Sequence, residues 1–205
     1  QAASPVDSYA APEPSPEPAE NSLPDVDITS WEFLLANPTH PIGEYTPQTE
    51  TIEGQQLDYR IIEPMREFVA AARAEGLSVY LSSGYRTYAD QNYLFNRKIG
   101  QGYSEEDAAK IVARPGTSEH QTGLCMDLIV GGANPVLDES FADHACYRWL
   151  VENAHKFGFI LRFPKGKETV TGYSYEPWHY RFVGVEAATE IYRRGITLEQ
   201  YLEKY

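Results

Sequence analysis

Residues 118–128 read SEHQTGLCMDL, a polar loop that runs directly into an apolar strand. A carboxylate, Asp127, lies inside the apolar part between Met126 and Leu128, seven residues after His120. Burying an ionised carboxylate without a partner is costly, so Asp127 must be paired. The stretch therefore raises the question of which cation or donor meets Asp127 inside a strand.

The segments around this strand predict an α+β fold. Apolar residues at helical spacing predict helices over 59–76, 87–100, 104–114 and 140–157, the last being the longest and ending at Gly158. Short β-rich runs predict strands over 77–86, 123–130, 159–163 and 178–184, and one or two closing helices follow from Val185, the last beginning at Thr197. This order predicts a small, mostly antiparallel sheet with helices packed around it.

The N-terminal part differs in composition from the rest. Residues 1–22 carry five prolines and no periodic apolar pattern, which predicts a solvated, semi-rigid spacer or, alternatively, a disordered tail. Over 23–58 we expect an arm, helical or extended, that docks through Trp31, Phe33 and Leu34. The globular domain is expected over 59–205.

Charge is distributed unevenly along the chain. The net charge is −13, but residues 1–59 hold eleven acidic and no basic side chains, whereas the remainder holds 19 acidic and 17 basic ones. Nucleic-acid binding is not expected, because it requires a basic patch. No apolar run reaches the roughly 20 residues of a membrane span. We expect no membrane insertion by these residues, and an anchor upstream of the spacer as a hypothesis.

Five histidines are candidates for chemistry. His144 and His155 are not i,i+4 neighbours, so we expect surface or helix-packing roles for them, and a structural role for His40. His120 and His179 differ, because His120 lies in a loop that leads into the strand of Asp127, and His179 follows Glu176 closely in SYEPWHYRF. Together with Asp127 they form a normal ligand set for catalytic zinc, which leaves one position open.

Glu176 lies three residues before His179, and Pro177 between them keeps the chain extended. In an extended chain the two side chains would point to opposite faces, so a bend must bring both to the metal. Glu176 would then accept a proton from an attacking water and pass it to a leaving amine. The alternative is that Asp127 bonds Arg86 or a backbone turn, and that the histidines are unrelated.

These residues resemble the signatures of a known family, the zinc D-Ala-D-Ala carboxypeptidases of the VanY and VanX type, in the lysostaphin, D-Ala-D-Ala metallopeptidase and hedgehog group. Ser118, His120, Gly123 and Asp127 resemble its SxHxxGxAxD signature. Its second motif is similar to Glu176, Trp178 and His179, and residues 83–87 (SGYRT) with Gln91 are also VanY-like. The resemblance covers about residues 59–184.

The resemblance implies a hedgehog/D-Ala-D-Ala-peptidase-like fold and a role for each matching residue. One Zn²⁺ ion would be bound by His120, Asp127 and His179, and Glu176 would be the general base and acid. Arg86 would stabilise the oxyanion, with a structural ion pair to Glu119 or another acid as the alternative. Further substrate contacts would come from Ser118, Gln91, Tyr85, Tyr175 and Trp178, although the aromatic residues could equally be core.

The two cysteines, Cys125 and Cys146, permit one disulfide or two free thiols. Cys125 stands where the family usually has alanine. We favour a disulfide, which would close a loop of about 20 residues and contribute about 3 kcal/mol. Because Cys125 and Asp127 share a strand face, this disulfide requires the helix of Cys146 to pack near the metal. A third interpretation is a thiol that competes for zinc.

The function expected from the resemblance is a D,D-carboxypeptidase that removes the C-terminal D-Ala from peptidoglycan stem peptides through a metal-activated water. Three alternatives stay open: an L,D-carboxypeptidase acting on tetrapeptide stems, a peptidoglycan endopeptidase, and a non-catalytic, hedgehog-like zinc-binding module. Retention of Glu176 argues against the last. We expect a monomer outside the cytoplasm, associated with the cell envelope as a secreted or anchored protein.

Overall fold

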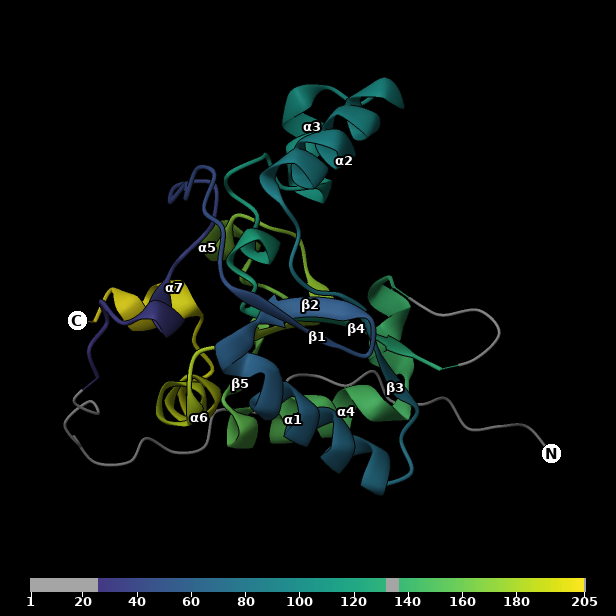
Figure 1. Cartoon of the computed structure of the whole chain (residues 1–205), viewed down its shortest axis with the longest axis vertical. Helices are drawn as coiled ribbons and strands as arrows, with labels where there is room; N and C mark the ends of the chain where they lie inside the picture. Colours follow the sequence, from purple (N-terminus) through teal and green to yellow (C-terminus); the bar gives the residue numbers. More distant parts are fainter. Residues whose placement is uncertain (1–25, 132–136, 205) are drawn as a thin grey trace.

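The structure is a computed structural model that describes residues 26–131 and 137–204. The predicted spacer over 1–22 lies outside these residues. The centre of the fold is a four-stranded antiparallel sheet in the order β3 (Val79–Ser83), β4 (Cys125–Val130), β6 (Glu176–Phe182) and β5 (Phe159–Phe163). Helices surround it (Figure 1), so the predicted α+β class is confirmed.

One face of the sheet carries the main apolar core. Alternate residues of β4, Met126, Leu128 and Val130, pack there with α1 (Ile62–Ala74) and α4 (Ala145–Asn153). Figure 1 shows α1 and α4 side by side beneath the sheet. The helix α1 buries Met65 and Phe68 as its spacing predicts, and Phe68 stacks on Phe159 of β5 at 5.3 Å.

Two further helices extend on the other side of the sheet. These are α2 (Tyr88–Gly100) and α3 (Glu105–Ile111), which contact one another away from the main core (Figure 1). Each begins as predicted, because the side chains of Thr87 and Ser104 accept the backbone N–H three residues later. The single turn α5 (Glu168–Thr171) precedes β6.

The C-terminal helices build a second, smaller core with the N-terminal arm. α6 (Val185–Arg194) and α7 (Leu198–Leu202) bury Ile191, Leu198 and Tyr201 against Phe33 of the short 3₁₀ helix η1 (Trp31–Phe33). Thr197 caps α7 with a reciprocal capping box, as expected for a helix that begins there. No helix among the described residues is long and apolar enough to cross a membrane.

The prediction of one continuous helix over 140–157 is wrong. The segment consists of a 3₁₀ helix, η4 (Glu139–Asp143), then α4, then a second 3₁₀ helix, η5 (Ala154–Phe157). His144 is extended, with ψ 143°, so the chain leaves helical geometry between η4 and α4. The predicted stop is confirmed, because Gly158 adopts the left-handed conformation after η5.

A hairpin inside the arm was not predicted. β1 (Thr49–Ile52) and β2 (Gln55–Asp58) pair through the turn Glu53-Gly54, where both residues have positive φ. Ile52 and Leu57 are buried in the main core. The domain boundary at residue 59 stays a prediction.

Candidate metal centre and substrate pocket

Two of the predicted metal ligands face each other across the middle of the sheet. The register pairs Asp127 of β4 with His179 of β6, and Ser83 of β3 with Asp127. Directly paired residues of antiparallel strands point to the same face. These three side chains therefore lie in a row on the face opposite the main core.

His120 reaches the same face from the 3₁₀ helix η3 (Glu119–Thr122), which leads into β4. The helix ends at Gly123 with φ 70°, where an added Cβ would lie 2.9 Å from the backbone nitrogen of Asp58. His120 Nδ1 lies 2.7 Å from the Gly84 carbonyl oxygen and donates to it. Nε2 is thereby left facing Asp127, 3.3 Å from Oδ2.

His179 has a matching arrangement with the opposite nitrogen. Its Nε2 lies 3.1 Å from Oε2 of Glu119 and donates a hydrogen bond to it. Its Nδ1 faces Asp127, 3.0 Å from Oδ1. Metal-binding histidines characteristically give one N–H to a carbonyl or carboxylate and keep the other nitrogen for the ion.

The atoms that face one another here lack protein partners. Asp127 Oδ1 and His179 Nδ1 are buried without a hydrogen bond, although they lie only 3.0 Å apart. Two lone pairs that face each other at this distance repel unless they share a proton or a metal ion. Two imidazoles and one carboxylate are a known ligand set for catalytic zinc. His120, Asp127 and His179 therefore fit a single zinc ion.

The electrostatics of the centre favour a cation. Burial lowers the pKa of His120, but Cys125 and Asp127 outweigh it and raise this pKa to about 9. Burial likewise raises the pKa of Asp127, but the two histidines hold it well below its usual range. A bound cation would replace the histidine protons, since metal binding and protonation compete.

Glu176 begins β6 beside these ligands and is 24% exposed. The predicted bend is present: the β5–β6 register passes from Leu161 opposite Tyr180 to Phe163 opposite Glu176, so β6 carries extra residues there. This irregularity brings Glu176 Oε2 to 3.4 Å from His179 Nδ1, although strict alternation would separate the two side chains.

Arg86 is held by polar side chains. Its guanidinium donates to Gln91 Oε1 at 2.8 Å and to Ser83 Oγ at 2.9 Å. Gln91 in turn donates its Nε2–H to the Ala113 carbonyl at 2.7 Å, so both ends of this amide are engaged within the protein. Gln91 therefore positions Arg86. The alternative ion pair with Glu119 is not formed, because Glu119 pairs with other arginines.

A cavity of about 400 Å³ opens over the centre. Arg86, Ser118, Glu176 and Trp178 line it together with the three proposed ligands. Tyr85 and Tyr175, predicted as substrate contacts, are absent from its lining, and the Tyr175 hydroxyl donates to that of Tyr147 instead. The aromatic wall comes from the predicted Trp178 and from Phe163 and Tyr173, which sequence reasoning did not select. His40, His144 and His155 lie away from this cavity.

The model of one protein family, described as VanY: D-alanyl-D-alanine carboxypeptidase, matches residues 54–185. This range contains every residue of the centre. The chain belongs to this family. The predicted membership, and with it the zinc metallopeptidase class, is confirmed.

Individual relatives agree with the VanY assignment. A D-alanyl-D-alanine carboxypeptidase of Enterococcus faecalis is 40% identical in an alignment 199 residues long that covers 90% of this chain and 72% of the relative. The crystal structure of a vancomycin resistance D,D-pentapeptidase VanY variant in complex with Zn(II) is 41% identical, with a TM-score of 0.74 over 84% of this chain and 99% of that one. The LdcB LD-carboxypeptidase is 35% identical, with a TM-score of 0.74 over 90% and 94%.

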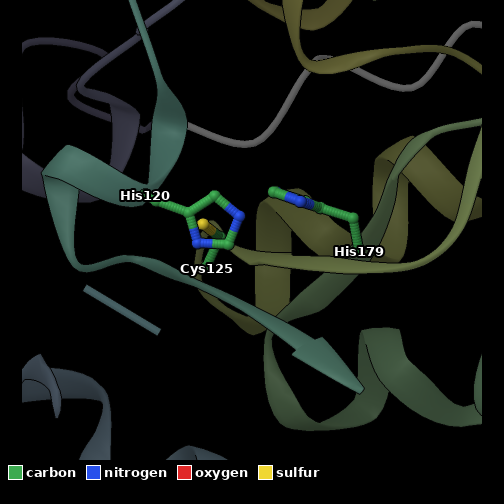
Figure 2. A group of neighbouring side chains, drawn as sticks. All are labelled: His120, Cys125 and His179. Carbon is green, nitrogen blue, oxygen red and sulfur yellow. The ribbon is translucent and has the colours of Figure 1, made fainter. Parts of the chain in front are cut away.

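The disulfide predicted for this VanY-family chain is not formed. Cys125 and Cys146 are both free and buried. Cys125 shares the metal face of β4 with Asp127, whereas Cys146 on α4 packs with Met126 and Leu128 in the main core. The sheet separates the two sulfur atoms, so the prediction of a bridge is wrong. Figure 2 shows the Cys125 sulfur beside the imidazoles of His120 and His179.

Sequence reasoning also missed the charges behind His179. Glu119 Oε1 accepts from Arg162 Nε and Arg181 Nη1, each at 2.7 Å, and all three side chains are buried. Arg162 continues to Glu199 of α7, at 2.6 Å between Nη2 and Oε1. The available signal was an arginine within each of two apolar strands, at 159–163 and 176–182, in addition to the acid beside His120.

Proposed function

We propose that this VanY-family enzyme uses one zinc ion, held by His120, Asp127 and His179, to remove the C-terminal D-Ala from peptidoglycan stem peptides. The observation that carries the proposal is the pair of buried, unpartnered atoms Asp127 Oδ1 and His179 Nδ1 beside Glu176. When bound, zinc supplies Lewis-acid polarisation and lowers the pKa of water to about 7.

Glu176 is the group that moves the proton. Its carboxylate lines the cavity beside the proposed ligands and is partly open to solvent. Oε2 accepts the proton of the attacking water and then delivers it to the nitrogen of the departing D-Ala. A carboxylate suffices as base at neutral pH because the water is already acidified.

Arg86 stabilises the charge that develops on the carbonyl oxygen. It lines the same cavity, and the hydrogen bonds from Gln91 and Ser83 preorganise its guanidinium before the substrate enters. A preorganised cation at this oxygen contributes several kcal/mol to acyl transfer, of the order of 3 kcal/mol for one donor. Ser118 is buried at the cavity wall, which supports a hydrogen bond from its hydroxyl to the terminal part of the peptide.

A second candidate is an L,D-carboxypeptidase acting on tetrapeptide stems. The likeness to the LdcB LD-carboxypeptidase, at 35% identity over 94% of that chain, favours it as the alternative. The same metal and acid–base groups serve both reactions. The difference lies in how the wall formed by Phe163, Tyr173 and Trp178 meets the residue before the scissile bond.

Because stem peptides are the substrate proposed, the enzyme acts outside the cytoplasm at the cell envelope. We propose a monomer that is secreted or held by an upstream anchor. Fractionation of the producing cells, with detection of the protein in the envelope or medium, tests this location. Recovery in the cytoplasm alone would contradict it.

The decisive experiment incubates the enzyme with defined pentapeptide, tetrapeptide and cross-linked muropeptides and identifies the products by mass. Loss of one D-Ala from the pentapeptide supports the D,D reaction. Cleavage of the tetrapeptide alone would assign the L,D reaction, and cleavage of only the cross-link would assign an endopeptidase.

Two variants and a chelator test the mechanism in the same assay. Glu176→Ala should lower kcat by about 10² to 10⁴, while Glu186→Ala, an exposed acid on α6, should be unchanged. Chelation should abolish turnover and added zinc should restore it. Full turnover by Glu176→Ala would refute the role given to this carboxylate.

A further inference from the structure

Cys125 lies at the metal centre, yet no step of the proposed reaction uses it. Its side chain is 0% exposed and shares the β4 face of Asp127. The Cys125 sulfur and one ring nitrogen from each of His120 and His179 all lie within 4.8 Å of one another (Figure 2). Asp127, Glu176 and His179 form a second donor set of the same kind, and His179 belongs to both.

The spacing of the cysteine set suits a metal ion. Zinc–sulfur bonds of about 2.3 Å and zinc–nitrogen bonds of about 2.0 Å place two ligand atoms at most about 4.3 Å apart. Small side-chain rotations would therefore close the cysteine set around an ion. His179, whose Nδ1 is buried without a partner, belongs to this set as well as to the proposed zinc site, so its donor is available to an ion at either position.

The two donor sets differ in their access to solvent. The cysteine set is buried throughout, whereas the carboxylate set includes Glu176, which is 24% exposed on the cavity. Closed sites with sulfur ligands are typical of structural zinc, and sites with an open position are typical of catalytic zinc. One centre thus contains the donors of both kinds of site.

We propose that the metal has a second, inner position held by His120, Cys125 and His179, in which it is withdrawn from Glu176 and inactive. The inference rests on the proposed zinc site. In the inner position the Cys125 thiolate would replace the Asp127 carboxylate as a ligand, and the thiol proton would pass to solvent. The inner position prefers soft, thiophilic ions, because thiolate ligands select them. In the proposed resting state the ion occupies this inner position, and substrate binding shifts it toward Glu176.

Cobalt in place of zinc tests the sulfur ligand directly. The full chain loaded with Co²⁺ should show a sulfur-to-cobalt charge-transfer band in the near ultraviolet. Cys125→Ala should lose this band and keep the visible cobalt bands, because His120, Asp127 and His179 remain. Cobalt affinity of this variant should fall at least about tenfold, the lower end of what loss of even an outer-sphere partner costs.

Cys146→Ala is the matched control, because it removes the other buried thiol on the opposite face of the sheet. It should keep the charge-transfer band. Cys125→Ser, which replaces the sulfur by an oxygen and keeps a polar side chain, should lose the band as Cys125→Ala does. Cobalt binding by the wild type without a charge-transfer band, or a band that survives in Cys125→Ala, would overturn the inner position. Failure of the wild type to bind cobalt at all would instead refute the proposed metal site, and the inference with it.

The dipeptide D-Ala-D-Ala tests the movement between positions. Saturating dipeptide should weaken the charge-transfer band of the cobalt enzyme, because the ligand draws the ion toward Glu176. A band of undiminished intensity would show that sulfur is a permanent ligand, and it would overturn the two-position proposal. Cadmium should inhibit the wild type more strongly than Cys125→Ala, and equal inhibition would count against the inner position.

Discussion

Glu119 is a buried carboxylate that contacts a proposed metal ligand and two arginines at once. One oxygen accepts from Arg162 and Arg181, and the other faces Nε2 of His179. Leaving buried charges without their partner is far more costly than losing an exposed pair. The orientation of His179 and the stability of the fold therefore depend on the same side chain.

Replacing Glu119 by glutamine tests this dual role. Glu119→Gln should lower the free energy of unfolding by about 3 to 5 kcal/mol, because the buried guanidinium of Arg181 loses its counter-charge and that of Arg162 keeps only Glu199. Zinc affinity should fall by about 10- to 100-fold through loss of the His179 partner. Urea denaturation and metal titration measure the two effects. Glu106→Gln, at an exposed acid of α3, should stay within about 0.5 kcal/mol of the wild type.

The same residue predicts a pH dependence of the metal-free protein. Burial raises the pKa of Glu119, but Arg162 and Arg181 outweigh it and hold the pKa well below its usual range. A lowered folded-state pKa gives stability that is complete above the unfolded pKa of about 4.3 and is lost as the pH falls. Chelator-treated protein should lose stability progressively below about pH 5. Glu119→Gln should show a shallower slope there, and equal slopes would contradict this account.

Arg86 offers a test in which activity and stability separate. Arg86→Gln should lower kcat by about 10² to 10³, as does removal of one preorganised oxyanion donor. The melting temperature should change little, because the group is only partly buried. Steady-state kinetics and thermal denaturation measure the two quantities. The exposed Arg66→Gln on α1 serves as control, and similar losses in both variants would remove the proposed role.

Among the elements, the N-terminal arm is hydrogen-bonded to the group of buried charges behind His179. Arg181 donates to the backbone carbonyls of Glu32 and Leu34 at 2.8 and 2.9 Å, and also binds Glu119. Phe33 lies in the second core and stacks on Tyr201 of α7 at 6.0 Å. The arm thus helps to hold Arg181 in place, and through it Glu119 and His179.

Phe33→Ala tests the contribution of the arm. Removing this buried ring should lower the free energy of unfolding by about 3 to 5 kcal/mol, because apolar burial is lost and a cavity remains. Chemical denaturation measures the cost, and Val185→Ala, at a side chain that is 53% exposed, is the control. A loss of less than about 1 kcal/mol, below the range for core substitutions, would show that the arm docks only loosely.

At the scale of the whole molecule, the sheet separates an apolar core from a charged centre. α1 and α4 cover the first face, and the cavity opens on the second. A zinc ion that binds the folded protein but not the unfolded chain must stabilise the entire domain, because the ligands come together only on folding. Folding and metal loading are therefore coupled.

Metal removal should lower the melting temperature of the protein. At zinc 100 times above its dissociation constant, binding stabilises the fold by about 2.7 kcal/mol. Calorimetry with zinc and with chelator measures the difference. Asp127→Asn, which weakens the ligand set, should show a much smaller zinc-dependent shift. A full shift in that variant would place the metal elsewhere.

The agreement between sequence and structure varies with the range of the interaction. The capped helices over 88–100 and 105–111 were predicted because their caps and periodicity lie within a few residues. The helix over 140–157 was predicted as continuous because periodicity alone does not reveal the extended backbone of His144. The hairpin over 49–58 was missed because its two strands are short and mostly polar.

The sequence by itself indicated the donors proposed for the centre and, through the family motifs that they match, the reaction class, because side-chain chemistry and motif spacing are local properties of the chain. Only the tertiary structure decided that Asp127 lies opposite His179, that Glu119 joins two arginines behind it, and that Cys125 lies on the face of the proposed metal site while Cys146 lies in the core. Strand register and the faces that helices cover depend on contacts between segments far apart in the chain.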